Sequence, residues 1–213
     1  MNNNTFIITT TTYPSQKKLC YTSSRSVFTP DERISQMHAS IESVLHHCPS
    51  ARIVWVENGQ KDVASSVPSH IDYYYAGKNF WVRRTADCSF KGLGESFLLL
   101  WLLNRPSLLP KADLYFKMSG RYFLTEQFDI RSWECQKMSF LFYGRSVSTR
   151  LYSIPAGALH CWKKALFLCT IGLLQSKSIE DLLPKFIPKD IICQRNQLGV
   201  SGYVAPTGEV LSE

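Results

Sequence analysis

The chain has 213 residues, enough for one substantial hydrophobic core and too few for two comfortable domains. Hydrophobic residues make up 45% and charged residues 19%, which is ordinary for a globular protein and excludes a disordered or fibrous one. The net charge of +7 suits an anionic partner such as a nucleotide, a nucleic acid or a membrane surface, but the cations are scattered and form no basic tail.

The first half of the chain predicts strands and helices in alternation. A β-branched strand at Thr5–Tyr13 is followed by a helix that starts with a capping box at Thr29–Glu32 and ends before Pro49. The other expected elements are two strands, a glycine-punctuated loop that runs into a helix, and a further strand, at Ala51–Gly59, His70–Gly77, Lys91–Asn104 and Ala112–Gly120. This order is typical of an α/β domain whose sheet is mostly parallel.

The second half of the chain is less regular. We expect a strand at Ser139–Gly144, helices at Ala156–Gln175 and Ser178–Phe186, and a closing hairpin or loop at Gln197–Glu209. No repeat or convincing linker divides the sequence. The prediction is therefore one domain over residues 1–213, which could also be part of a larger multidomain chain.

Polar residues gather where four of the predicted elements end or begin. In parallel sheets ligands bind at the carboxyl ends of the strands, so we expect these groups at one edge. Hydroxyls, a carboxylate and an amide that can hydrogen-bond a base and a ribose lie at Thr9–Tyr13, Glu57 and Asn58. Cations and glycine N–H groups that suit a diphosphate lie at Lys91–Glu95 and Lys117–Tyr122. Strand propensity or turn formation is enough to explain each of these polar segments alone. Only the presence of all of them at one edge indicates a nucleotide site.

Five motifs together carry a family resemblance. They are Thr at the end of the first strand, R-x-x-Q-x-x-x-S-I from Arg33, a strand that ends in Glu-Asn, K-G-x-G-E from Lys91, and K-x-S-G-R-Y from Lys117. This set resembles the nucleotide-sugar glycosyltransferases with the GT-A fold, including the Fringe-type enzymes, over about two thirds of the chain. The resemblance implies one α/β domain with a mostly parallel central sheet and helices on both faces. Residues 1–125 would form the nucleotide-sugar half and residues 126–213 the acceptor-side half.

The resemblance also implies an activity and a set of binding residues. The enzyme would move a hexose or deoxyhexose from a UDP-sugar to a hydroxyl group of a glycan or glycoprotein. The residues that would bind the nucleotide sugar are Thr9, Thr10, Thr11, Tyr13, Arg33, Glu57, Asn58, Lys91, Gly92, Gly94, Glu95, Lys117, Ser119, Gly120, Arg121 and Tyr122.

The metal motif of the family is missing. Its members hold a divalent cation, Mn2+ or Mg2+, on a D-x-D motif, but no two acidic residues of this chain stand two apart. Lys117 and Ser119 occupy that place, and a Lys and an Arg can neutralise the departing UDP as a metal would. Both the metal-dependent and the metal-independent reaction stay open.

The acceptor side is expected in the second half of the chain. By resemblance, "STRLYSIP" and "SIEDLL" close the site, which makes Arg150 a catalytic candidate and Tyr152 an acceptor-side candidate. Glu180 is the candidate base, because an inverting transfer needs a carboxylate to take the proton of the acceptor hydroxyl. The competing explanation is that Glu180 is the N3 capping residue of a helix that begins at Ser178 or Lys177.

A rival hypothesis is a non-catalytic basic α/β module that binds nucleic acid. It accounts for the net charge but requires a contiguous basic face and a steep salt dependence. The clustering of cations and glycines at strand ends favours the transferase, so no nucleic-acid partner is expected.

The cysteines and the apolar segments bear on location. The odd number of cysteines without a C-x-x-C pair argues against a disulfide framework and a zinc ribbon: Cys20, Cys48, Cys88, Cys135, Cys161, Cys169 and Cys193. The first residues do not resemble a signal peptide, and the longest apolar segments are shorter than the roughly 20 residues of a membrane span. We expect reduced thiols, a cytoplasmic location and no membrane span.

Overall fold

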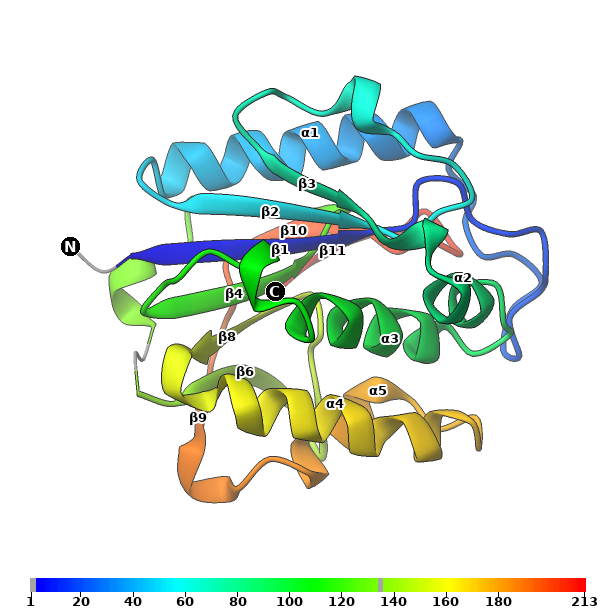
Figure 1. The fold of residues 1–213 in the computed structure, drawn as a ribbon. Coiled ribbons are helices and arrows are strands. Elements are labelled where there is room, and N and C mark those ends of the chain that lie inside the picture. Colours follow the sequence, from blue (N-terminus) through cyan, green and yellow to red (C-terminus); the bar gives the residue numbers. More distant parts are fainter. Residues whose placement is uncertain (1–2, 134–135) are drawn as a thin grey trace.

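A mixed eight-stranded sheet lies at the centre of the protein, whose computed structural model describes residues 3–133 and 136–213 (Figure 1). The strand order is β3 (Asp72–Tyr75), β2 (Arg52–Glu57), β1 (Asn4–Thr10), β4 (Leu114–Ser119), β8 (Leu151–Pro155), β6 (Met138–Tyr143) and β7 (Ser146–Val147), with β9 (Ile192–Arg195) also paired to β6. Strands β3, β2, β1 and β4 are parallel, and β8 runs antiparallel to β4. The expectation of a mostly parallel sheet is confirmed.

Helices cover both faces of the sheet, as expected. Helix α1 (Pro30–His47) packs on one face, and α2 (Phe80–Ala86), α3 (Lys91–Leu103) and α4 (Leu159–Leu173) lie on the other (Figure 1). Alternation along β1 explains the two cores, because Phe6 and Ile8 pack with α1 whereas Ile7 packs in the cluster that contains α3 and α4.

The register of the parallel strands brings polar residues to one edge. Thr10 pairs with Glu57 of β2, and Thr9 pairs with Ser119 of β4. The carboxyl ends of these strands therefore lie side by side, on the right of Figure 1, where the first turn of α3 also begins.

Several elements differ from the sequence-based expectation. Helix α3 begins at Lys91 itself, so the glycines of K-G-x-G-E lie in its first turn and not in a preceding loop. The expected helix at Ser178–Phe186 is a four-residue α5 (Ile179–Leu182) followed by a 3-10 turn. Helix α2 and strand β8 were not predicted.

The C-terminal segment forms a hairpin, one of the two expected alternatives, but its second strand begins at Val210, beyond the expected range. Strand β10 (Val200–Tyr203) pairs antiparallel with β11 (Val210–Ser212), and β10 also pairs with β5 (Tyr122–Leu124), which makes a second, three-stranded sheet. This sheet places the end of the chain against the segment that follows β4.

Two further features of the structure concern the state of the cysteines and the apolar length of the helices. The cysteines in the described part of the chain are free thiols, and Cys135 lies outside the described residues. None of the described helices combines the length and the apolar character that crossing a membrane requires.

Candidate functional site

A cavity of about 410 Å³ opens at the carboxyl ends of β1 and β4, between α3, α5 and the segment before α1. Its size suits a small-molecule ligand. The predicted site residues that line it are Thr9, Thr10, Thr11, Arg33, Asn58, Lys91, Gly92, Gly94, Glu95, Ser119, Arg121, Tyr122, Arg150 and Glu180. The structure thus brings most of the candidates from both halves of the sequence into one cavity.

Glu57 lies behind the cavity wall and is fully buried. Its carboxylate accepts hydrogen bonds from the Thr10 hydroxyl at 2.7 Å, from the Thr12 amide and hydroxyl at 3.0 and 2.6 Å, and from the Gly59 amide. These bonds tie the end of β1 to the end of β2. Glu57 therefore positions the Thr10–Thr12 segment and does not offer its oxygens to a ligand, in contrast to the sequence-based assignment.

Thr11 and Asn58 supply the polar groups at this end of the cavity. The Thr11 hydroxyl donates to Asn58 Oδ1 at 2.6 Å, and Asn58 Nδ2 donates to the carbonyl of Gly94 in α3 at 3.5 Å. The two side chains are oriented by β1, β2 and α3 together. Such hydroxyl and amide groups are the kind that hydrogen-bond a base or a ribose.

Lys117 is fully buried and forms an ion pair with Glu95 of α3. Its ammonium also donates to Ser119 Oγ at 3.0 Å and to the Thr149 carbonyl at 2.8 Å. Burial alone would raise the pKa of Glu95, but Lys117, followed by Lys91 and Arg121, lowers it. Lys117 does not line the cavity, so the sequence-based assignment of this cation to a diphosphate is replaced by a structural role.

Five cations line the cavity without a carboxylate partner in the described part of the chain: Arg25, Arg33, Lys91, Arg121 and Lys177. Three of them, Arg33, Lys91 and Arg121, are site residues predicted from the sequence. Burial, and then the charge of Arg121, lowers the pKa of Arg33 to about 9 and that of Lys91 to about 8. Lys91 stays exposed to the solvent of the cavity, which moderates this effect. Arg33 is only 6% exposed, and its Nε has no hydrogen-bond partner. The cations repel one another, and the buried Nε of Arg33 lacks an acceptor, so an anion bound at this wall would be stabilised.

The cavity does not fit a divalent metal held on carboxylates. The carboxylates that line it are Glu95, which Lys117 neutralises, and Glu180. The described residues contain one group of three side chains close enough to hold a metal ion, His46, His47 and Glu126, and it lies outside the cavity. Because Mn2+ and Mg2+ prefer several oxygen ligands, a wall of cations with one free carboxylate is a poor site for either ion.

Glu180 faces the cavity from the start of α5. Ser178 is the N-cap of this helix, and its hydroxyl accepts from the amide of Asp181 at 3.1 Å, so Asp181 and not Glu180 holds the N3 position. The Glu180 carboxylate accepts instead from the Thr149 hydroxyl at 2.9 Å. The capping explanation for Glu180 is therefore wrong, and its carboxylate is open to a ligand.

Arg150 and Tyr152 have different surroundings. Arg150 lines the cavity, donates to the Tyr122 hydroxyl at 2.9 Å and pairs with Glu213 near the C-terminus. Tyr152 is only 1% exposed, stacks on Phe140 at 5.0 Å between ring centroids and accepts from Trp162 Nε1. The acceptor-side role expected for Tyr152 is therefore wrong, because β8 is a central strand that turns this ring into the core.

Three further residues that the sequence proposed for the site, Tyr13, Gly120 and Gly94, make close contacts within the protein. Tyr13 lies outside the cavity, with the Lys61 ammonium 5.0 Å from its ring centroid. Gly120 also does not line it, and a Cβ there would collide with Thr10 and Met37. Gly94 lines the cavity and lets α3 approach α2, since a Cβ would come within 2.9 Å of the Ala86 Cα.

Sequence reasoning missed the segment between β1 and α1. Tyr21 and Arg25 of this segment line the cavity, and Tyr21 is 63% exposed. Arg25 holds the segment in place through bonds to the carbonyls of Lys17 at 2.6 Å and Ala86 at 2.9 Å. The stretch has no periodicity and no motif, so the sequence carries no signal for this role.

The sheet order and the helices on both faces are those of the GT-A fold, with the cavity at the carboxyl edge of its sheet. The chain is similar to the crystal structure of the galactosyltransferase LgtC in complex with donor and acceptor sugar analogues. The TM-score is 0.53 at 10% sequence identity, over 96% of this chain and 88% of that one.

A second similar structure is a glycosyltransferase involved in the glycosylation of the major capsid of PBCV-1. Its TM-score is 0.46 at 11% identity, over 91% of this chain and 81% of that one. No family model and no curated protein matches the sequence. At 10% identity, the similarity to LgtC shows the fold alone.

Proposed function

We propose that the protein is a glycosyltransferase that moves a hexose or deoxyhexose from a UDP-sugar to a hydroxyl group of a glycan or glycoprotein. The observation that carries this proposal is the set of unpaired cations, among them Arg33, Lys91 and Arg121, in a cavity at the carboxyl edge of a GT-A sheet. Such a wall matches the two negative charges of a sugar diphosphate. Thr11 and Asn58, further along the same edge, match a base and ribose.

The chemistry follows from the groups around the cavity. The bond between the sugar C1 and the diphosphate oxygen breaks, and its electron pair leaves with UDP while the acceptor oxygen bonds to C1. In an inverting transfer, Glu180 accepts the proton that the acceptor hydroxyl loses. Arg121 and Lys91 stabilise the negative charge that develops on the departing UDP.

The same cations make a metal ion unnecessary in this proposal. In the GT-A family a divalent cation would neutralise the diphosphate, and here Arg33, Lys91 and Arg121, which line the cavity, would supply that positive charge. A guanidinium and an ammonium supply comparable charge without carboxylate ligands. We therefore expect sugar transfer and UDP binding to survive removal of divalent cations.

Thermal unfolding with nucleotides tests both statements. UDP and UDP-sugars at millimolar concentration should raise Tm, because a ligand that binds only the folded state stabilises it by mass action. The rise should be the same with EDTA as with Mn2+. A rise with another nucleotide but not with UDP would overturn the donor assignment, and a rise that requires Mn2+ would overturn the metal-independent site alone.

A further inference from the structure

Large apolar side chains are exposed together on the face formed by α2 and α4. Single exposed apolar residues are normal on a protein surface, but a collected patch usually marks an interaction site. The members of this patch are Phe80, Trp81, Phe167, Ile171 and Leu174, each at least 60% exposed. Phe167 and Ile171 of α4 and its C-cap Leu174 follow helical spacing, so they form one stripe along the outer side of this helix.

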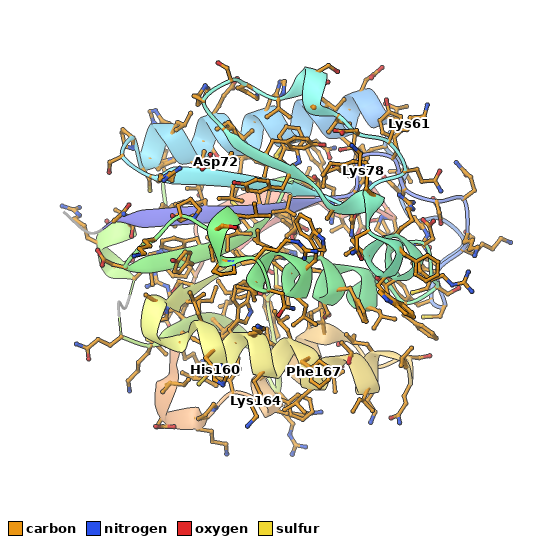
Figure 2. All side chains as sticks on the ribbon, in the orientation of Figure 1. Lys61, Asp72, Lys78, His160, Lys164 and Phe167 are labelled. Atoms are coloured by element: carbon orange, nitrogen blue, oxygen red, sulfur yellow. The ribbon has the colours of Figure 1, made fainter. Side chains whose placement is uncertain are left out.

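A groove joins the two helices across α3. It has a volume of about 730 Å³, and the aromatic rings of Trp81, Trp101 and Phe167 line it together with Lys163 and Lys164. Figure 2 shows His160, Lys164 and Phe167 side by side along α4. The apolar stripe and the groove are therefore parts of one surface, here called the α2–α4 face.

The charge on this face has a single sign. Helices α2 and α4 contain no acidic residue, and the one acidic residue of α3, Glu95, faces the other cavity and pairs with Lys117. Lys164 and Arg84 are exposed at the margins of the apolar side chains. Asp87, directly after α2, pairs with Arg83, and no acidic residue lines the groove in the described part of the chain. Exposed aromatic and aliphatic groups beside Lys163, Lys164 and Arg84 complement a surface that is negative on the outside and apolar just beneath.

We propose that the α2–α4 face docks the protein on an anionic lipid bilayer. The apolar stripe of α4 enters the headgroup region, Trp81 lies at the boundary between water and acyl chains, and the stems of Lys163 and Lys164 extend toward the lipid phosphates. Helix α4 ends at the catalytic cavity, where Leu173 and Lys177 line the wall. Docking would therefore hold the cavity mouth close to the membrane surface, whichever acceptor is used.

Flotation with lipid vesicles tests this proposal. The protein should float with vesicles of phosphatidylcholine and phosphatidylserine in a 7:3 ratio, and much less with phosphatidylcholine alone. Phe167→Ser should lower the partition coefficient about tenfold, because it removes one large inserted side chain. Lys164→Glu should lower it about fivefold or more through the lost attraction to anionic lipid.

Two matched variants separate docking from a general change in surface character. Val210→Ser removes an exposed apolar side chain from β11, and Lys61→Glu reverses a charge beside α1, where Figure 2 places Lys61. Both should leave flotation unchanged. Circular dichroism and Tm should be unchanged for all four variants, since the altered side chains are exposed.

Three outcomes would overturn the proposal. They are no flotation with either vesicle, equal loss in the matched variants, and a dimer in analytical ultracentrifugation that Phe167→Ser abolishes. The last result would show that a second copy of the chain covers the face. UDP binding is measured in parallel without vesicles, so failure to dock and failure to bind the donor remain distinguishable.

Discussion

Lys117 and Arg121 lie close together in sequence, yet their surroundings differ. Lys117 is buried against Glu95, whereas Arg121 lines the cavity and has no carboxylate partner among the described residues. Sequence patterns could place both near the carboxyl end of β4 but could not decide which side chain faces a ligand. The answer depends on α3, which carries Glu95 to the side of β4 on which Lys117 projects.

Arg121→Ala should weaken UDP binding by a factor of about 10 to 100 while uridine binding stays nearly the same. The reason is that a charge-assisted hydrogen bond contributes about 1.5–3 kcal/mol, and uridine lacks the phosphates that would use it. Titration calorimetry with both ligands measures the difference. Equal losses for UDP and uridine would show that Arg121 does not face the diphosphate.

Lys117→Met should act on stability instead. The substitution leaves Glu95 partly buried without its ion-pair partner, and removal of one partner of a buried pair costs about 3 kcal/mol. Denaturant unfolding should show this loss in the free energy of unfolding. An unchanged unfolding midpoint together with a large loss of UDP affinity would return Lys117 to the ligand site.

Lys91 should make donor binding depend on pH. Burial and the nearby charge of Arg121 lower the pKa of its ammonium to about 8, so near pH 8 a fraction of the free protein carries neutral Lys91. A bound diphosphate favours the charged form and raises this pKa, so binding of a UDP-sugar at pH 8 takes up protons and weakens as the pH rises further.

Titration calorimetry at pH 8 in buffers with different ionisation enthalpies measures the proton uptake. Lys91→Met should abolish it, whereas Lys61→Met, at an exposed lysine away from the cavity, should leave it unchanged. Proton uptake that persists in Lys91→Met would assign the titrating group elsewhere.

At the scale of elements, the sequence predicts what local signals determine. Helix α1 begins where the capping box of Thr29 and Glu32 predicts, because these contacts form within one turn. The buried parallel strands β1 and β2 are likewise visible as β-branched runs, and β4 is visible as an apolar and aromatic run. Strand β8 lacks such a run, and it is defined by its pairing with β4 and β6, which are distant in sequence. Helix α2 is only seven residues long; its Asn79 cap is a local contact, but the helix also packs closely against α3, and the sequence does not show this packing.

The contact of α2 with α3 is set by Gly94. In Gly94→Ala the new Cβ would lie 2.9 Å from the Ala86 Cα and 3.2 Å from the Thr85 carbonyl, so the helices must separate. Overpacking of this kind costs about 1–3 kcal/mol. Gly157→Ala is the matched control, since a Cβ there meets nothing within 4 Å. Thermal unfolding should show a lower Tm for the first variant only, and an equal Tm would contradict the close approach.

At the scale of the whole molecule, part of the positive charge behind the net charge of +7 is concentrated at two places on the fold. Six cations line the cavity, among them Arg33, Lys91 and Arg121, and others lie on the α2–α4 face beside apolar side chains. The composition alone was compatible with a nucleotide, a nucleic acid or a membrane surface, because it contains no information on how scattered residues meet. The fold collects part of the charge in a concave site too small for a nucleic-acid helix, where it suits a small anion.

The protein should therefore bind oligonucleotides only weakly. A nucleic-acid module contacts many phosphates, so its affinity falls by a factor of about 10³–10⁵ between 50 and 200 mM salt. UDP offers one diphosphate, and its binding should fall far less over the same range. Filter binding with single-stranded and duplex oligonucleotides, beside calorimetry with UDP, compares the two salt slopes. Submicromolar oligonucleotide binding at 150 mM salt, with no competition from UDP, would favour the nucleic-acid module over the transferase, because the charge would then act through an open face and not through the cavity.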